Sequence, residues 1–350
     1  MNTVTVSASR IYDVKIGRGL LGDAGKDLNA LFPAPRKVMV ISDDTVRALW
    51  GDRLIATLRE AGYTVFEFVF PHGEASKTAT TLISIWEALA SANLTRTDFI
   101  AALGGGVVGD MAGFAAATYL RGIPFVQFPT TLLAMVDSSV GGKTGADLAI
   151  GKNLIGAFHQ PSAVFCDTDA LSTLPEDIFA DGCAEVIKYG YINDPALLDL
   201  LQKPFADAPE DIITRCIADK RDLVEADERD TGARQLLNLG HTAGHAVEAL
   251  SDFRISHGSA VAIGMLLMAK AAVAAGLCDS RVPAHMEAML RRYHLPTDCP
   301  FDAAALAAVA LSDKKRKGSS ITLVLPERVG SSRLHTVSAD SLTAFFEGGR

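Results

Sequence analysis

The first half of the sequence alternates short apolar runs with longer helical patterns, and this alternation limits the possible folds most strongly. The predicted order is strand 37–42, helix 43–60, strand 63–69, helix 80–92, strand 99–103, helix 111–120 and strand 124–128. Strands that alternate with helices predict β-α-β units and a mostly parallel sheet. In such sheets ligands bind at the carboxyl ends of the strands.

The second half has a different pattern. Helical periodicity predicts the helices 178–202, 211–226, 235–250, 259–275, 283–293 and 302–311, and one late strand at 321–325. A chain of 350 residues exceeds one typical domain. We therefore predict an α/β nucleotide-binding domain at 1–172 and a mainly α-helical domain at 173–350.

Composition restricts the partners and the compartment. The formal net charge is -8 and no basic stripe is present, which argues against nucleic acid or an anionic membrane surface and leaves a small anionic substrate open. The five cysteines form no C-x-x-C pair, and the first residues lack a signal-peptide pattern, so we expect a cytoplasmic location. The apolar run 99–120 is long enough for a membrane span, but its glycines and Asp110 fit a strand, loop and helix better.

A glycine-rich segment, 103–110 (LGGGVVGD), lies between a predicted strand and a predicted helix. Glycines let a backbone approach a pyrophosphate, and a helix N-terminus offers N–H groups to it. The segment is not G-x-G-x-x-G, and a tight packing turn explains it equally well. Nearby, Glu74 and Lys77 lie on a predicted loop, where they either contact a nucleotide or are simply solvated.

Two further segments place glycines beside lysines: 136–144 (VDSSVGGKT) and 150–154 (IGKNL). A glycine before Lys143 or Lys152 allows a turn that directs an ammonium group at an anion, whereas the alternative is an exposed, solubilising loop. Asp137 follows an apolar run, and a buried Asp needs a partner or a function.

One carboxylate and two or three histidines predict a metal site. Glu185 and Lys188 share one helical face, although a surface ion pair would have the same spacing. His241 and His245 are four residues apart, with Asn238 expected on the same face, and His257 precedes a glycine. A carboxylate with two imidazoles is a common ligand set for catalytic zinc, and the remaining histidine would contact phosphate or transfer a proton.

Several motifs together resemble those of the 3-dehydroquinate synthase family of sugar-phosphate cyclases, along nearly the whole chain. The matching segments are 73–78 (GEASKT), 104–113 (GGGVVGDMAG), 121–122 (RG), 129–145 (PTTLLAMVDSSVGGKTG), 151–158 (GKNLIGAF), 184–188 (AEVIK), 237–245 (LNLGHTAGH), 257–258 (HG) and 313–315 (DKK).

This resemblance implies a homodimer whose active site lies between the two domains of each chain. It implies conversion of 3-deoxy-D-arabino-heptulosonate 7-phosphate to 3-dehydroquinate and phosphate, a step of the shikimate pathway, with NAD regenerated in each turnover and zinc or cobalt as the metal. NAD supplies the transient oxidation of a ring hydroxyl, and the metal polarises that hydroxyl.

The resemblance also assigns roles to residues. Its metal ligands are Glu185, His241 and His257. Its phosphate contacts are Lys143, Asn153, Asn238, His245 and Lys315, the last preferred over Lys314, with Arg121 reaching the partner's site. Its carboxylate contacts are Lys220 and Arg234, and its ring-hydroxyl contacts are Asp137 and Lys188. Its NAD contacts are Asp43, Glu74, Lys77, Gly105, Gly106, Asp110, Thr130, Thr131, Lys152 and Thr173.

The chain departs from the family pattern at a few positions. Ser259 replaces a glutamate, which predicts the loss of a carboxylate that orients a metal ligand. Ile178 replaces an acidic residue, and Asp230 is shorter than the usual glutamate. The alternatives are another cyclase, a metal-dependent polyol dehydrogenase, or a catalytically silent paralogue that binds nucleotide.

Overall fold

The computed structural model describes residues 1–312, 316–317 and 319–350. Its contacts divide the chain into two compact units. Unit 1 comprises residues 1–175 and 209–229, and unit 2 comprises 176–208 and 230–350. The division differs from the predicted one because residues 209–229, which follow the predicted boundary at 172, group with unit 1.

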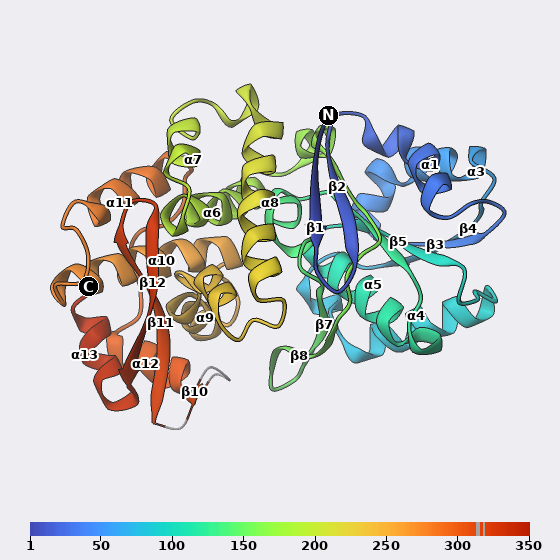
Figure 1. Ribbon diagram of the computed structural model, residues 1–350. Coiled ribbons are helices and arrows are strands. Elements are labelled where there is room, and N and C mark those ends of the chain that lie inside the picture. Colours follow the sequence, from blue (N-terminus) through green and yellow to red (C-terminus); the bar gives the residue numbers. More distant parts are fainter. Residues whose placement is uncertain (313–315, 318) are drawn as a thin grey trace. The chain divides into compact units, whose positions relative to one another are not determined.

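Unit 1 is built on a seven-stranded sheet with the strand order β1-β2-β9-β6-β5-β3-β4 (Figure 1). All neighbours are parallel except the β1–β2 hairpin. The strands are β1 (Asn2–Ser7), β2 (Ile11–Gly17), β3 (Lys37–Asp43), β4 (Thr64–Phe70), β5 (Phe99–Gly104), β6 (Phe125–Pro129) and β9 (Val164–Asp167). The predicted parallel sheet is therefore confirmed, while the hairpin and β9 were not predicted.

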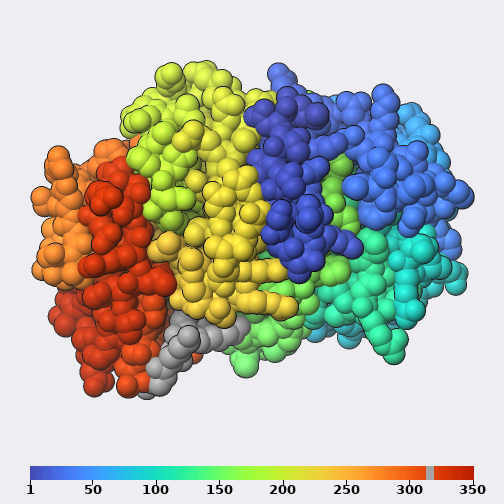
Figure 2. All heavy atoms as spheres, in the orientation of Figure 1, coloured from blue at the N-terminus to red at the C-terminus, as the bar shows by residue number. Residues whose placement is uncertain are grey.

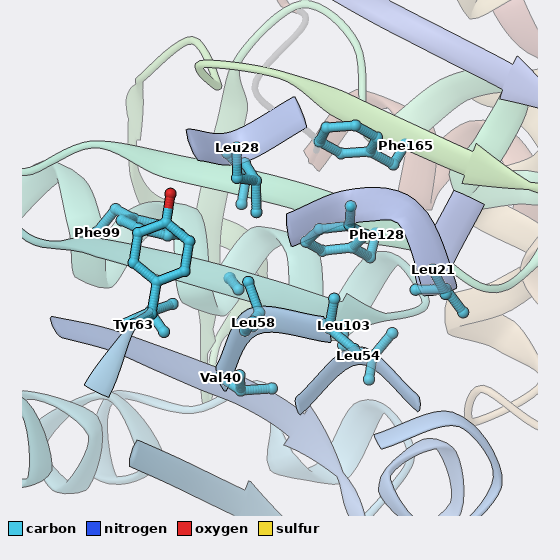
Figure 3. Close-up of a cluster of buried hydrophobic side chains, with 14 of the residues drawn as sticks. Leu21, Leu28, Val40, Leu54, Leu58, Tyr63, Phe99, Leu103, Phe128 and Phe165 are labelled. Atoms are coloured by element: carbon cyan, nitrogen blue, oxygen red, sulfur yellow. The ribbon is translucent and has the colours of Figure 1, made fainter. Parts of the chain in front are cut away.

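Helices cover both faces of this sheet, because successive residues of its central strands point to opposite sides. Val40 packs with Leu28 and Leu58 in one buried cluster (Figure 3), whereas Ile41 packs with Leu82 in another. The helical segments of unit 1 are α1 (Leu20–Leu31), α2 (Asp44–Val46), the π-helical η1 (Arg47–Gly51), α3 (Asp52–Glu60), η2 (Glu74–Ser76), α4 (Ala79–Ser91), α5 (Gly106–Thr118), η3 (Tyr119–Arg121), η4 (Ala134–Ser138), η5 (Thr168–Thr173) and α8 (Pro209–Ala226).

Helix α8 belongs to unit 1 because its apolar side is buried against the first hairpin. Ile213 and Ile217 are fully buried, and α8 packs on β1. The amide of Ser7 also donates to the Glu225 carboxylate at 2.6 Å, and Asn2 bonds Thr214 at 3.0 Å. In Figure 2 the dark blue atoms of the hairpin lie against the yellow segment that contains α8.

Unit 2 is mainly helical, as predicted, with a small sheet. Its helical segments are α6 (Glu176–Ile192), α7 (Pro195–Leu200), η6 (Phe205–Asp207), η7 (Ala233–Asn238), α9 (His241–Leu250), α10 (His257–Ala274), α11 (Val282–Arg292), α12 (Ala303–Ser312), η8 (Ala339–Ser341) and α13 (Leu342–Glu347). The single strand predicted near 321 is one of three: β10 (Arg316–Lys317), β11 (Ser320–Arg328) and β12 (Ser331–Ser338). Helix α10 is long and apolar enough to cross a membrane, but 72% of it is buried, as in a core helix.

Two predicted helices of unit 2 are each divided in two. The helix predicted at 178–202 stops at Ile192 and resumes at Pro195, because proline lacks an N–H and disfavours the helical conformation in the residue before it. The helix predicted at 235–250 breaks at Gly240, whose φ of 79° lies in the left-handed region. Asn238 therefore does not share a helical face with His241, contrary to the prediction.

Candidate active site

Three predicted metal ligands come together in unit 2. Glu185 lies in the middle of α6, His241 is the first residue of α9, and His257 is the first residue of α10. The Nε2 atoms of both histidines lie 3.6 Å from the Oε1 atom of Glu185. Ligand atoms of the three residues all lie within 4.8 Å of one another.

The geometry of this cluster fits a small divalent cation. Zinc bound tetrahedrally to nitrogen and carboxylate oxygen keeps its ligand atoms roughly 3.4 Å apart, close to the separations observed here. The Glu185 side chain is fully buried. A buried carboxylate beside two imidazoles favours a cation at their centre.

Gly240 allows α9 to begin where it does. A Cβ atom at Gly240 would lie 2.5 Å from the Cγ of Met265 and 2.7 Å from the carbonyl oxygen of Val261, both on α10. The positive φ and this close approach both require glycine. Gly240 therefore lets the start of α9, which carries His241, pack closely on α10.

Both histidines have their other ring nitrogen occupied. The Nδ1 of His241 lies 3.1 Å from the Leu239 carbonyl oxygen, so this nitrogen carries the proton and leaves the Nε2 lone pair for a metal. The Nδ1 of His257 lies 3.2 Å from Oε2 of Glu248. Burial alone would lower the pKa of His257, but the adjacent carboxylates of Glu185 and Glu248 outweigh it and raise the pKa to about 10.

Glu248 was not among the predicted residues. It is 5% exposed and supplies the kind of carboxylate that the Ser259 replacement was expected to remove. The sequence carries a signal for it, because Glu248 lies seven residues after His241 and three after His245 on an otherwise apolar helix face. A carboxylate therefore contacts His257 even though position 259 carries a serine.

Lys188 forms an ion pair with Glu185 one turn along α6. Their side chains are 1% and 0% exposed, so the alternative of a surface ion pair is wrong. Removing either partner would leave a buried charge uncompensated.

Unit 2 also contains the predicted substrate-binding residues His245, Asn238 and Arg234. The His245 ring centroid lies 5.5 Å from that of His241 and 6.1 Å from that of His257. Asn238 donates from Nδ2 to the Gln235 carbonyl at 3.0 Å, and Arg234 is 1% exposed. Lys315 and Lys314 lie outside the described residues.

In unit 1 the predicted cofactor residues gather at one edge of the sheet, the carboxyl ends of its parallel strands. Asp43 ends β3, Glu74 follows β4, and Thr173 follows β9. Gly105 and Gly106 connect β5 to α5, and Thr130 and Thr131 follow β6. The topology thus brings five separate segments to the edge where α/β sheets bind ligands.

This edge has features that fit a dinucleotide. Helix α5 begins at Gly106, and its start is closely packed. A Cβ atom at Gly105 would lie 3.0 Å from the Cγ2 of Thr131, and one at Gly106 would lie 3.2 Å from the Oγ of Ser138, so both positions favour glycine. The N–H groups of the first helical turn suit a phosphate. Thr130 Oγ1 is buried and has no hydrogen-bond partner among the described residues.

A buried polar cluster lies beside this edge. The ammonium group of Lys77 bonds Asp110 and Asn153, each at 2.7 Å. Burial is the largest influence on Lys77 and lowers its pKa, but the carboxylates of Asp110 and Glu74 outweigh it, so the pKa is raised. Lys152 lies 3.8 Å from Glu74. The predicted cofactor residues Glu74, Lys77, Asp110 and Lys152 thus form one connected set of charges.

Lys143 and Lys152 lie on a β-hairpin and not on the loops that were predicted. Strand β7 (Lys143–Leu148) pairs antiparallel with β8 (Gly151–Phe158). Glycines permit the close pairing, because a Cβ atom at Gly156 would lie 2.1 Å from the Thr144 carbonyl oxygen. The small side chains obscured the strand pattern in the sequence.

Asp137 and Lys220 are paired with each other in unit 1, with 2.5 Å between Oδ1 and Nζ. Asp137 is 23% exposed, so its predicted burial is only partial. Arg121 is exposed in a turn where Leu120 and Arg121 have φ values of 51° and 68°.

The three positions that depart from the family pattern all lie among the described residues. Ile178 is 39% exposed on α6, and Asp230 has a φ of 59°. Ser259 bonds Asp181 through its amide and its hydroxyl.

Comparison with known sequences gives a consistent result. Residues 67–181 match the family described as 3-dehydroquinate synthase N-terminal, and residues 182–316 match 3-dehydroquinate synthase C-terminal. The chain is 46% identical over 340 residues to a 3-dehydroquinate synthase of Geobacter metallireducens, covering 94% of each. It is 45% identical over 346 residues to that of Caulobacter vibrioides, again covering 94% of each.

Solved structures with a similar fold include two other cyclases. A 2-deoxy-scyllo-inosose synthase solved with carbaglucose-6-phosphate, NAD+ and Co2+ has a TM-score of 0.86 and 25% identity, with all of both chains covered. The 2-epi-5-epi-valiolone synthase of Streptomyces hygroscopicus subsp. jinggangensis, with NAD+ and Zn2+ bound, has a TM-score of 0.88 and 26% identity, covering 99% of this chain and 98% of its own. A glycerol dehydrogenase of Schizosaccharomyces pombe shares the fold alone, with a TM-score of 0.61 at 16% identity, covering 98% and 91% of the chains.

Proposed function

Because the chain belongs to the 3-dehydroquinate synthase family, we propose that it converts 3-deoxy-D-arabino-heptulosonate 7-phosphate to 3-dehydroquinate and inorganic phosphate. The observation that carries this proposal is the cluster of Glu185, His241 and His257, in which the fully buried Glu185 also pairs with Lys188. The reaction serves aromatic amino-acid biosynthesis, and the enzyme works in the cytoplasm.

The metal and the cofactor use separate residues. When bound, NAD accepts and returns a hydride and zinc polarises the ring hydroxyl being oxidised. Glu185, His241 and His257 would hold the metal. The strand ends of unit 1 would hold NAD, with Asp43 and Glu74 accepting hydrogen bonds from ribose hydroxyls and Gly105, Gly106 and the start of α5 receiving the pyrophosphate. Lys77, Asp110, Thr130, Thr131, Lys152 and Thr173 complete this cofactor set.

Cations of the chain bind the two acidic groups of the substrate. Lys143, Asn153, Asn238, His245 and Lys315 contact the phosphate, and Lys220 with Arg234 holds the carboxylate. Lys220 pairs with Asp137, and Asp137 contacts the ring hydroxyls. Lys188 contacts the same hydroxyls and compensates the charge of Glu185.

The reaction needs few proton transfers from the protein. Oxidation of one ring hydroxyl makes the adjacent C–H acidic, and the substrate's own phosphate takes this proton as it leaves. With NAD bound to return the hydride, the ring would open and an intramolecular aldol step would close the carbocycle. His245, one turn along α9 from His241, stabilises the departing phosphate.

We also propose a homodimer in which Arg121 reaches the partner's phosphate site. The support is local strain: Leu120 and Arg121 are consecutive non-glycine residues in the left-handed region. Each such residue costs about 1–2 kcal/mol, and strain of this kind persists where it serves a site. The turn presents the guanidinium group to the surface.

The decisive experiment measures phosphate release from 3-deoxy-D-arabino-heptulosonate 7-phosphate while absorbance of NADH is followed. Release that requires both NAD and zinc, with no net NADH, supports the proposal. Net NADH without phosphate would indicate a polyol dehydrogenase. No change in either signal, with metal and NAD shown to be bound, would indicate another cyclase or a silent paralogue.

A further inference from the structure

A carboxylate of helix α6 binds the N-terminus of helix α10. Oδ1 of Asp181 accepts hydrogen bonds from the Ser256 hydroxyl at 2.6 Å, from the Ser259 amide at 3.1 Å and from the Ser259 hydroxyl at 3.2 Å. All three donors belong to the cap and the first turn of α10. Asp181 therefore provides an acceptor for this helix end from a different helix.

This arrangement replaces the usual local cap. A helix that begins with Ser is commonly capped by its own hydroxyl and by a Glu three residues later, which bonds back to the first residue. Here the residue three after Ser256 is Ser259, and the Ser256 side chain makes no capping bond within the helix. The acceptor and the negative charge, which also suits the helix dipole, come from Asp181 instead.

The backbones of the two helices meet at the same point. A Cβ atom at Gly258 would lie 2.3 Å from the Asp181 carbonyl oxygen and 2.4 Å from its Cα. Only glycine allows this approach. The contact and the three hydrogen bonds fix the first turn of α10 against one turn of α6.

Both elements joined here carry metal ligands. Asp181 lies four residues, about one turn, before Glu185 on α6. His257 lies between Ser256 and Gly258 and is the first residue of α10. A shift of the α10 N-terminus along α6 would thus move the Nε2 of His257 directly away from Glu185, from which it is now 3.6 Å.

We propose that Asp181 is a positioning residue for the metal site: through Ser256 and Ser259 it sets the separation of His257 from Glu185 and so the affinity for the metal. This inference rests on the proposed function only for the existence of that site. Because residue 259 is a serine and not a glutamate, the local capping carboxylate is missing, and Asp181 supplies it in this chain.

The test measures the zinc dissociation constant of metal-stripped protein by competition with a chromophoric chelator. We expect Asp181→Ala to raise it about 10- to 100-fold, the range typical of residues that support metal ligands. The visible spectrum of the Co2+ form should change as well, because the ligand geometry is altered. Asp177→Ala is the matched control, since Asp177 is an exposed acidic residue one turn earlier on α6, and it should leave both measurements unchanged.

A rescue variant distinguishes positioning from general damage. Ser259→Glu restores the local capping pattern, so Asp181→Ala/Ser259→Glu should recover most of the lost affinity. Ser259→Glu alone should weaken zinc binding, because two carboxylates would then meet at one helix end. Asp181→Asn keeps one acceptor oxygen, so its zinc affinity should fall only a few-fold. This variant replaces Asp181→Ala in the test if the alanine variant does not fold.

The outcomes separate this inference from the proposed function. Wild-type affinity in folded Asp181→Ala, or no recovery in the double variant, would overturn the inference while leaving the metal site intact. Failure of the wild-type protein to bind zinc would instead overturn the proposed function. The measurement needs no substrate, so loss of turnover for another reason does not affect it.

Discussion

The two ring nitrogens of His257 face two different carboxylates: Nδ1 lies 3.2 Å from Glu248, and Nε2 lies 3.6 Å from Glu185. Glu248 thus fixes the ring plane and leaves Nε2 directed at the cluster. A carboxylate behind a histidine ligand also increases the basicity of the imidazole, and hence its affinity for a metal.

Glu248→Gln should weaken zinc binding about 10-fold, because the amide can hold the ring but cannot supply the charge. Chelator competition on metal-stripped protein measures this effect. Glu287→Gln, which removes a carboxylate from an exposed ion pair with Arg291, is the control. Equal zinc affinity in Glu248→Gln and wild type would show that the contact is only structural.

Lys188→Met should destabilise the metal-free protein by about 3–5 kcal/mol, because it leaves the fully buried Glu185 carboxylate without its partner. Zinc should restore much of this stability, since the cation compensates the same charge. Urea unfolding with and without zinc measures both effects, and Lys203→Met, at an exposed lysine, is the control. A zinc-independent loss of stability would contradict this explanation.

The affinity for NAD should fall on acidification. Burial raises the pKa of Asp43, and the amide of Val46 only partly opposes this. The proposed ribose contact needs the ionised carboxylate, so affinity should begin to decline at a higher pH than an ordinary aspartate would give. Asp43→Asn should bind NAD about 10-fold more weakly at neutral pH, as expected for loss of a charged hydrogen bond, and should lose this pH dependence. Quenching of Trp50, which bonds Thr173 at 3.1 Å, offers a binding signal.

Removal of the metal with a chelator should abolish phosphate release but leave NAD binding nearly unchanged. The proposed ligands of the metal all belong to unit 2, whereas the proposed cofactor residues belong to unit 1. Calorimetric titration of stripped and zinc-loaded protein with NAD tests this. A large loss of NAD affinity on stripping would show that the two sets of residues depend on each other.

Mixing two inactive variants should restore activity if Arg121 acts across a dimer. Arg121→Ala lacks the arginine, and His241→Ala lacks a metal ligand. Each mixed dimer would have one complete site, so statistical exchange should give roughly a quarter of wild-type activity. Activity that remains absent after exchange is verified would place Arg121 in its own subunit's site.

The sequence predicted the parallel sheet because buried strands such as β5 are continuously apolar. It did not predict the β7–β8 hairpin, where glycines that permit close pairing remove the alternating pattern. The pattern of its histidines predicted a metal site, and the resemblance to the family selected Glu185, His241 and His257 as the ligand set. For Glu248 the sequence contained only the spacing from His241 and His245 along α9, and for Asp181 it contained no signal, because the roles of both depend on which helix ends pack together and on how each ring is turned.

The packing of helix α8 limits where the chain can be truncated or where its segments can be exchanged with those of related enzymes. A fragment ending at residue 172 would lack α8 and expose the apolar surface of the hairpin that α8 covers. The two family matches meet between residues 181 and 182, inside α6, and so separate Asp181 from Glu185. Exchange of segments between related enzymes at that junction would therefore recombine the metal ligands of one parent with the helix anchor of another.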